Sequence, residues 1–205
     1  IAKIAASSQI LHDALAIVDN GTTLNVGTVN IASQLGNGTA YTARMNVTSI
    51  AGALGLGVQG ATSDINLGVV NGNLSPSSDA ITRIGENVRF TVSGNSASIT
   101  SSNQTRTRNE ITGVSAGYIA SGATLANTFN NGSSLVLTSA GFQLTGNSLS
   151  SSTTDLTLLA SSAKEDRVFT VAGSGGALSL TSAAAILNNR SETRVVLAGT
   201  DTGNT

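Results

Sequence analysis

The chain contains no cysteine and no tryptophan, and it has only one proline, one methionine and one histidine among 205 residues. Without cysteine, neither a disulfide framework nor a thiolate metal site is available. Only 10% of the residues are charged, against about 25% in ordinary globular domains. The net charge of −1 supplies no positive field for an anionic polymer, so nucleic acid is not an expected partner.

Long apolar runs are also missing. No stretch approaches the roughly 18–20 apolar residues of a transmembrane helix, so no membrane span is expected. No Asp, Glu, Lys or Arg occurs between Ile111 and Thr154 or between Met45 and Ser63. We expect other subunits to cover part of this uncharged surface. The alternative is a neutral, hydrated face rich in hydroxyl groups.

The residue patterns of catalytic and cofactor sites are absent as well. His12 lies beside Asp13, but none of the 28 serines stands in a nucleophile-elbow motif. The run from Gly173 to Gly176 lacks the Gly-Lys-Ser/Thr ending of a phosphate-binding loop and is expected to be a hairpin loop. The acidic residues are scattered without Asp-x-Asp spacing. The sequence therefore predicts no enzyme, no cofactor and no metal site.

Small polar residues dominate what is present. Ser, Thr, Asn and Gly make up 96 of the 205 residues. Apolar and polar residues alternate with a period of two in Thr23–Val26, and short apolar runs such as Leu135–Leu137 and Leu156–Leu159 are separated by Gly, Asn and Ser turns. Four Asn-Gly pairs are typical of hairpin turns. We expect a mostly β protein, an antiparallel sandwich or an open barrel.

The N-terminal segment 1–20 is the exception, because its apolar residues recur at seven-residue intervals. Ile4, Leu11 and Val18 follow this spacing, Leu15 takes a companion position, and several alanines favour a helix. An amphipathic helix is therefore expected. It would pack on the β core or dock on neighbouring subunits of a filament.

The remainder divides at the only proline, giving a β-rich segment 21–78 and a β domain 79–205. The second part contains two related strand-and-turn cassettes, 85–117 and 164–199. Each runs from charged residues into a Phe-Thr-Val strand, turns at glycine, and closes at Ala-Gly. We interpret them as a repeated structural unit.

Two groups of polar residues are candidate contact sites. Arg106 and Arg108 place two guanidinium groups on one face of a strand. They form either a surface patch or a contact to Asp64, Asp79 or Glu86 of a neighbouring subunit. Asn-x-Ser/Thr sequons allow glycosylation of a surface protein; besides the one at Asn73, which Pro76 follows, they are Asn20, Asn37, Asn46, Asn103, Asn131 and Asn189.

The composition, without Cys or Trp and rich in Ala, Ser, Thr, Asn and Gly, resembles that of bacterial flagellins and other subunits of extracellular filaments. The stretch from Val168 to Ser182, continued by Leu197 to Thr205, is similar to β modules of phage tail fibres and bacterial surface proteins. Both resemblances imply a fibrous or surface role.

The sequence thus predicts a structural protomer of an extracellular filament or surface assembly. It would associate with copies of itself through the N-terminal helix, through strand addition at a sheet edge, or through both. The alternative is a phage tail-fibre or adhesin-type module that binds glycans. The expected location is extracellular or at the cell surface, or on a virion in the alternative case.

Overall fold

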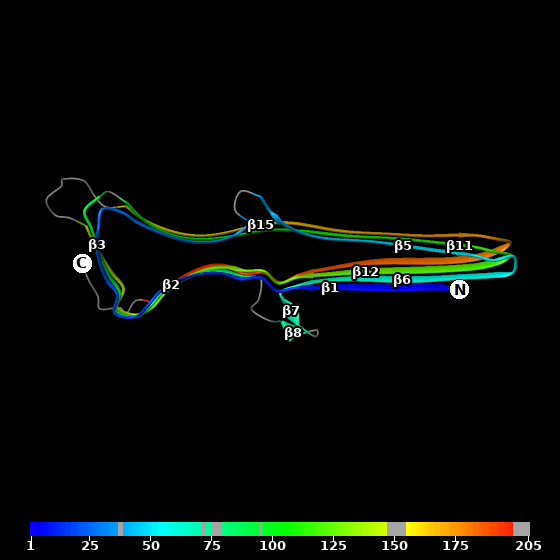
Figure 1. Cartoon of the computed structure of the whole chain (residues 1–205), viewed down its shortest axis with the longest axis horizontal. Coiled ribbons are helices and arrows are strands. Elements are labelled where there is room, and N and C mark those ends of the chain that lie inside the picture. Colours follow the sequence, from blue (N-terminus) through cyan, green and yellow to red (C-terminus); the bar gives the residue numbers. More distant parts are fainter. Residues whose placement is uncertain (37–38, 71–72, 75–78, 95, 147–154, 199–205) are drawn as a thin grey trace.

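The computed structural model describes residues 1–205 except 37–38, 71–72, 75–78, 95, 147–154 and 199–205. The described residues form strands and their connections, and none of them is helical. The strands wind as a parallel β-solenoid, seen in Figure 1 as two long layers joined at the right-hand end and closed by a short sheet on the left.

One circuit of the chain through four sheets is called a rung here. The first rung comprises β1 (Ala2–Ile10), β2 (Ala14–Val18), β3 (Thr23–Val26), β4 (Val29–Leu35) and β5 (Tyr41–Gly52). The second comprises β6 (Leu56–Leu67), a small hairpin of β7 (Val69–Val70) and β8 (Asn73–Leu74), then β9 (Ala80–Ile84), β10 (Arg89–Val92) and β11 (Ser96–Ala116). The third comprises β12 (Ile119–Asn130), β13 (Ser134–Thr138), β14 (Gln143–Gly146) and β15 (Asp155–Gly175), and a fourth begins with β16 (Leu178–Asn189) and β17 (Thr193–Leu197).

Strands at the same place in successive rungs pair in parallel and form the four sheets. Sheet A has the order β1-β6-β12-β16, and sheet B has the order β2-β9-β13-β17. Sheet C consists of β3-β10-β14. In sheet D, β11 pairs with β15 on one edge and with both β4 and β5 on the other. Only the β7–β8 hairpin is antiparallel among the described strands.

The register shows a structural repeat of about 60 residues. Ala2 pairs with Gln59, Gln59 with Gly122, and Gly122 with Thr181. These four residues differ in both size and polarity. The repeat is therefore visible in the backbone pairing and not in the residues that occupy it.

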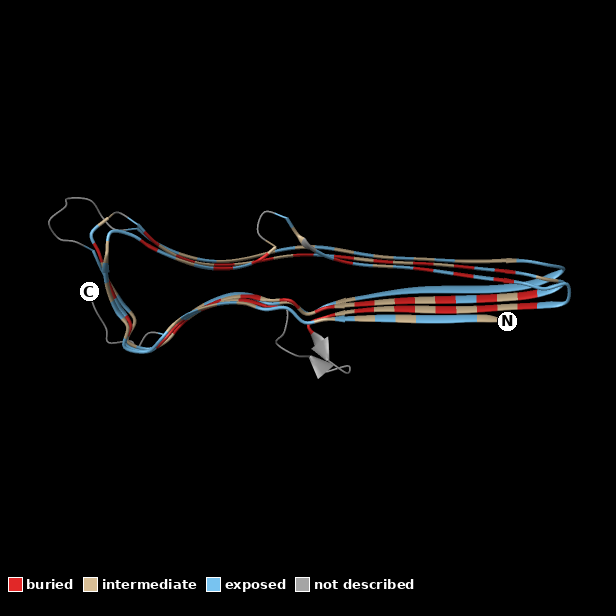
Figure 2. Ribbon diagram, in the orientation of Figure 1, coloured by how far each residue is buried: buried red, intermediate tan, exposed pale blue. Residues whose placement is uncertain are grey.

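Burial alternates along the strands because successive side chains point to opposite faces. Figure 2 shows this alternation in the central strands. At the wide end, sheets B, C and D enclose large apolar residues, among them Phe90, Ile84 and Ile99. The rings of Phe90 and Phe142 meet edge to face at 5.6 Å. Where sheets A and D lie against each other, the interior is thinner and holds smaller residues such as Ala61 and Ala126.

The corner between sheets B and C has the same backbone conformation in every complete rung. Gly21, Asn87 and Gly141 occupy equivalent positions and have φ values of 71°, 54° and 74°. Gly21 N donates to Glu86 O at 2.7 Å, and Asn87 N donates to Ala140 O at 3.0 Å. Glycine and asparagine adopt this left-handed conformation most readily. The Asn20-Gly21 pair is thus a solenoid corner.

The prediction of an N-terminal helix is wrong. Residues 1–20 contain β1 and β2, which pair with β6 and β9 along their whole lengths. Ala2, Ile4 and Ala6 face the interior at alternate positions. The apolar residues of this segment therefore follow a period of two as well as the seven-residue spacing. Pairing with a neighbouring strand outweighs the weak helix propensity of the alanines.

The antiparallel sandwich or open barrel is also wrong, although the prediction of a mostly β chain is confirmed. Parallel strands require a long crossover between partners. Here the crossover is the rest of a rung, which runs through three further sheets. The spacing of short strands alone does not distinguish this arrangement from a meander.

The predicted boundary at residue 78 lies outside the described residues. Strands from 1–78 and 79–205 pair with each other in all four sheets. The two cassettes occupy different places in a rung. Phe90 lies in sheet C beside Leu24 and Leu144, whereas Phe169 lies in sheet D beside Glu110.

Candidate assembly surface

Both ends of the solenoid present strand edges that have no partner among the described residues. At the upper end these strands are β14, β15, β16 and β17, and at the lower end they are β1 to β5. An exposed strand edge offers a row of backbone donors and acceptors to another chain.

Side-chain amides and hydroxyls show how the layers are staggered. The Asn109 amide in β11 donates to Ser63 O in β6 at 3.2 Å and to Asn127 O in β12 at 2.7 Å. The Ser101 hydroxyl in β11 bonds to Ala80 O of β9 and Ser134 Oγ of β13. Asn109 thus bridges two successive strands of sheet A, and Ser101 bridges two successive strands of sheet B.

The same stagger holds above and below β11. Thr82 of β9 bonds to Ser33 Oγ in β4 and to Thr100 O in β11. Asp166 of β15 accepts from the amides of Asn130 in β12 and Asn189 in β16. Each sheet D strand therefore lies about half a rung above one strand of sheets A and B and half a rung below the next.

The described stack accordingly begins and ends with strands of sheets A and B. We call β16 with β17 the upper shelf, and β1 with β2 the lower shelf. Each shelf has a strand of sheet D against only one half of its inner face. Leu187, Val195 and Leu197 are 48%, 39% and 64% exposed on the inner face of the upper shelf, and Ile4 is 39% exposed on the lower one.

The predicted assembly residues of the N-terminal segment divide between surface and core. Ile4 lies on the inner face of β1. Leu11, 48% exposed, follows β1, and Leu15, 59% exposed, points outward from β2. Val18 packs against the core at the wide end. They belong to the lower shelf, but they form no single stripe.

Arg106 and Arg108 point to the same outer face of sheet D, as predicted from their spacing. Their partners lie within the chain: Arg106 pairs with Glu165 at 2.7 Å and Arg108 with Glu110 at 2.6 Å. Within the described part of the chain, Asp64, Asp79 and Glu86 make no ion pair with them. Arg44, Arg108 and Arg167 share one register position in three rungs, where like charges would repel. Glu110 offsets this repulsion, since it also lies 3.9 Å from Arg44.

Lys164 and Asp79 form a polar cluster where the layers diverge. The Lys164 ammonium donates to Asn130 Oδ1 at 3.1 Å and to Gly132 O. Burial lowers the pKa of Lys164 to about 8, against the opposing attraction of Asp166 and Asp79. Burial likewise raises the pKa of Asp79, although Asp79 Oδ1 accepts a hydrogen bond from Ser133 N at 2.7 Å.

The sequons differ in accessibility. Asn46 is exposed on the outer face of β5, and Asn189 is exposed at the end of β16. Asn103 is fully buried and donates its amide to Ser133 O at 2.8 Å, so it is inaccessible in the folded chain. Asn131 is half-buried and donates to Gly68 O at 3.3 Å. Asn37 lies outside the described residues.

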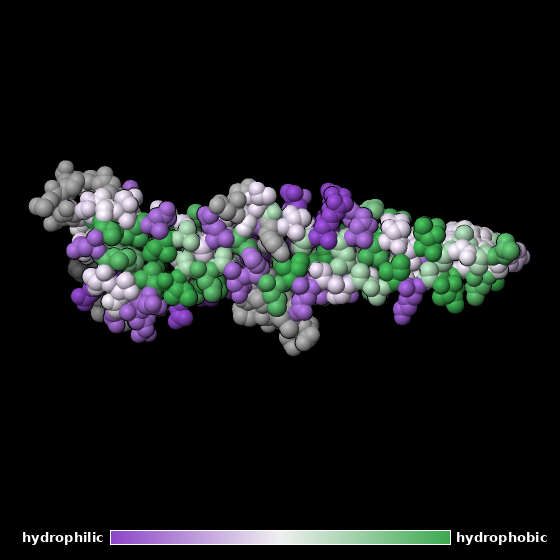
Figure 3. All heavy atoms as spheres, in the orientation of Figure 1, coloured by the Kyte–Doolittle hydropathy of each residue, from purple (hydrophilic) through white to green (hydrophobic). Residues whose placement is uncertain are grey.

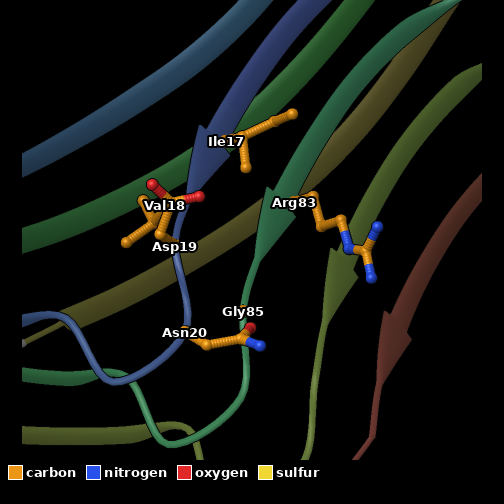
Figure 4. A pocket seen from close by; sticks show the side chains of 6 residues that line it. All are labelled: Ile17, Val18, Asp19, Asn20, Arg83 and Gly85. Atoms are coloured by element: carbon orange, nitrogen blue, oxygen red, sulfur yellow. The ribbon is translucent and has the colours of Figure 1, made fainter.

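Asn20 lies in a shallow depression on the outside of the corner between sheets B and C (Figure 4). Ile17 and Arg83 project from adjacent strands beside it, and Gly85 lies next to it. Asn20 Oδ1 accepts from Glu86 N at 2.9 Å. The amide therefore stabilises the corner, and this depression contains one carboxylate and no nucleophile–base pair.

Nothing in the described part of the chain groups three or more metal-ligating His, Cys, Asp or Glu side chains. His12 lies in the exposed connection between β1 and β2. Gly173 and Gly175 end β15, and Gly176 begins the turn from sheet D into sheet A. Gly176 lies against Gly117 O in the turn of the rung below. The glycine run is thus a turn between sheets and not a hairpin.

The exposed residues of the upper shelf were missed by the sequence analysis. The signal that would identify them is the position of β16 and β17 above β12 and β13, which depends on the 60-residue repeat. No protein-family model matches the chain, and neither a curated protein nor a solved structure is found similar to it. Among the described residues, no helix is long and apolar enough to cross a membrane.

Proposed function

We propose that the chain is a structural protomer of an extracellular filament or surface assembly, which associates with copies of itself by strand addition at the open ends of its sheets. The observation that carries this proposal is the uncharged strand β16, whose apolar side chains are exposed and whose outer edge has no partner among the described residues. Strand addition forms backbone hydrogen bonds and needs few charged residues. That requirement suits a chain in which only 10% of residues are charged.

Strand β16 also lacks the features that usually protect an edge strand. Natural proteins blunt edge strands with lysines, prolines, bulges or a covering loop. β16 contains no charged residue and no proline in twelve residues. Leu178, Leu180 and Ile186 on its outer face are 64%, 72% and 46% exposed. An uncovered edge of this kind favours pairing with another copy.

The test compares two leucine-to-lysine variants of the full chain by negative-stain electron microscopy. Leu187→Lys puts a charge on the inner face of the upper shelf and is expected to abolish polymers. Leu54→Lys changes an equally apolar residue that is fully exposed in the turn between β5 and β6, away from that shelf, and should leave polymers intact. Dispersed single particles in the unmodified protein would contradict the proposal.

Glycan binding is the second candidate, and one surface favours it. Phe169 is 54% exposed on the outer face of sheet D. It shares a shallow depression with Arg167 and Glu110. A ring beside a guanidinium group that has no ion pair among the described residues suits an acidic sugar. Phe169→Ala should then abolish binding of the uronate polymer alginate, while Phe142→Ala, at an internal ring, serves as the control for a destabilised fold.

A further inference from the structure

The polar cluster where the layers diverge brings a lysine, an asparagine and an aspartate together. Asn130 ends β12 and is 1% exposed. Lys164 and Asp166 lie two residues apart in β15, so both side chains point from the same, inner face of sheet D. The Lys164 ammonium donates to Asn130 Oδ1 at 3.1 Å, and Asn130 Nδ2 donates to Asp166 Oδ1 at 2.9 Å. The carboxamide thus contacts an amine on one side and a carboxylate on the other.

The first of these contacts places the amine next to the carboxamide carbon. A C=O bond is about 1.23 Å long, so Lys164 Nζ lies about 3.3–4.3 Å from Asn130 Cγ, depending on the angle at the oxygen. Reacting atoms in an enzyme site are held about 3–3.5 Å apart. A small movement of the lysine side chain therefore brings its nitrogen into bonding range of the carbon.

The groups around the Asn130 carboxamide match what acyl transfer requires. Gly132 N donates to Asn130 Oδ1 at 3.2 Å, so a backbone N–H faces the oxygen on which negative charge develops during attack. Asp166 contacts the Asn130 nitrogen, which is the leaving group. The near-complete burial of Asn130 shields its carbon from water, the competing nucleophile.

The surroundings of Lys164 favour its uncharged, nucleophilic form. Its ammonium donates to two neutral oxygens, Asn130 Oδ1 and Gly132 O. No carboxylate among the described residues lies within ion-pair distance of it, and Asp166 and Asp79 attract its charge only from farther away. Burial lowers the pKa of Lys164 to about 8. About a tenth of the molecules therefore carry the free amine at pH 7.

We propose that Lys164 and Asn130 condense to an amide, which cross-links β15 to the end of β12. The lone pair of Lys164 Nζ forms a bond to Asn130 Cγ, and the bond between Cγ and Nδ2 breaks. Two of the three ammonium protons move to the departing nitrogen by way of Asp166, and this nitrogen leaves as an ammonium ion. No atom is oxidised or reduced, so the step consumes no co-reactant.

The combination of these three residues does not follow from the stacking of rungs. One rung below, the equivalent positions hold Leu67, Thr105 and Thr107. None of these side chains carries an amine or a carboxamide, so the cross-link is specific to the third rung. It joins sheet D to the place where sheets A and B meet. Because the chain contains no cysteine, a disulfide cannot serve there, whereas an amide also resists reduction.

The reaction follows folding, because only the folded chain brings β12 and β15 together. A freshly folded chain therefore still carries the ammonium of Lys164 with its titration, and the matured chain carries an uncharged amide instead. The cross-link forms within one chain and does not depend on the self-association proposed above.

Trypsin digestion of the denatured chain, followed by mass spectrometry, tests the cross-link. Lys164 is the only tryptic site between Arg108 and Arg167, so the unlinked chain yields the fragment 109–164. The linked chain loses one ammonia, about 17 Da. Its amide blocks cleavage after Lys164, and the expected fragment is 109–167. An Asn-Gly pair such as Asn131-Gly132 can also lose ammonia by forming a succinimide, but Lys164 then remains cleavable.

Three variants separate these reactions. Lys164→Arg keeps the positive charge but cannot form the amide, so it should retain its full mass. Asn131→Gln removes the neighbouring Asn-Gly pair and should keep the 109–167 fragment. Asp166→Asn removes the proton carrier and should slow the loss of ammonia by about 100-fold, with circular dichroism verifying the fold.

The natural chain decides the matter, after incubation in the folded state until its mass no longer changes. A loss of about 17 Da together with the fragment 109–167 supports the cross-link. The full mass together with the fragment 109–164 overturns it. A loss of ammonia with the fragment 109–164 also overturns it and identifies a succinimide. Each of these results leaves the proposed self-association standing, since sedimentation tests that separately.

Discussion

The corner between sheets B and C requires a residue with positive φ, and a single substitution tests this requirement. Gly141 has φ +74°, and a Cβ there would meet Asn87 Oδ1. Gly141→Ala should lower the free energy of unfolding by about 1–3 kcal/mol, because alanine is strained in this conformation. Gly60→Ala is the control, since Gly60 is a strand residue with nothing within 4 Å of the added carbon. Urea denaturation measures both, and equal losses would contradict the account.

Substitutions at two buried side-chain amides are expected to affect stability differently. Asn109 donates to two backbone carbonyls, and Asn109→Leu leaves both without this donor, at a cost of about 2–4 kcal/mol. Gln59 is equally buried, but neither of its amide atoms has a protein partner in the described structure. Gln59→Met is therefore expected to be neutral or stabilising. A loss from Gln59→Met as large as that from Asn109→Leu would show that its amide is bonded.

Lys164 is expected to make the stability of the fold rise with pH. Its folded pKa of about 8 lies below the ordinary value of 10.5. Below pH 8 the ammonium is charged in both states, and burial penalises the folded one. Between about 8 and 10.5 the unfolded chain binds more protons, so this group makes stability rise with pH. Its half-buried position limits the gain to about 1–2 kcal/mol.

Thermal unfolding measured from pH 7 to pH 10.5 tests this. The Tm of the natural chain minus the Tm of Lys164→Met should increase as the pH rises. Comparing the two removes the contribution of the other titrating groups. A difference that stays constant over this range would contradict the assignment.

At the scale of whole strands, protection depends on whether one or both edges are paired. β6, β9, β10, β11, β12 and β13 have partners on both sides, whereas β1 to β5 and β14 to β17 have a partner on one side only. Hydrogen exchange in dilute solution is therefore expected to be fastest in β16 and β17 and slowest in β11 and β12. On concentration, β16 and β17 should gain protection, because strand addition covers their open edges. Loss of exchange in β6 alone would not fit the proposal.

The uncharged stretches also find an explanation at this scale. β12 lies between β6 and β16, so strands of the same chain cover both of its edges. In a parallel stack each side chain lies beside its equivalent in the next rung, and like charges at that spacing are unfavourable. Figure 3 shows hydrophilic side chains gathered over the middle and the wide end, with the tip mostly pale or hydrophobic.

For the whole molecule, the sequence predicts the strand content but not the winding. Alternation in segments such as Thr23–Val26 correctly identifies strands, and the shared orientation of Arg106 and Arg108 follows from the period of two. The N-terminal segment was misassigned because Ile4, Leu11 and Val18 satisfy a helical spacing while Ala2, Ile4 and Ala6 satisfy a strand spacing. Pairing with β6 decides between them, and that information is non-local.

The sequence does not predict the parallel winding, for a related reason. Stacked positions such as Gln59, Gly122 and Thr181 differ in size and polarity, and the rungs contain insertions such as the β7–β8 hairpin. A repeat of backbone position without a repeat of residues leaves no signal in composition or motif. The exposed shelf follows from the winding, so the sequence alone did not locate it.

Sedimentation velocity of the full chain over a wide concentration series tests the central claim of open-ended association most directly. The account predicts an average mass that rises with concentration above the 20.4 kDa of a single chain, with Leu187→Lys suppressing the rise and Leu54→Lys leaving it unchanged. A single 20.4 kDa species for the natural chain at every concentration would contradict it.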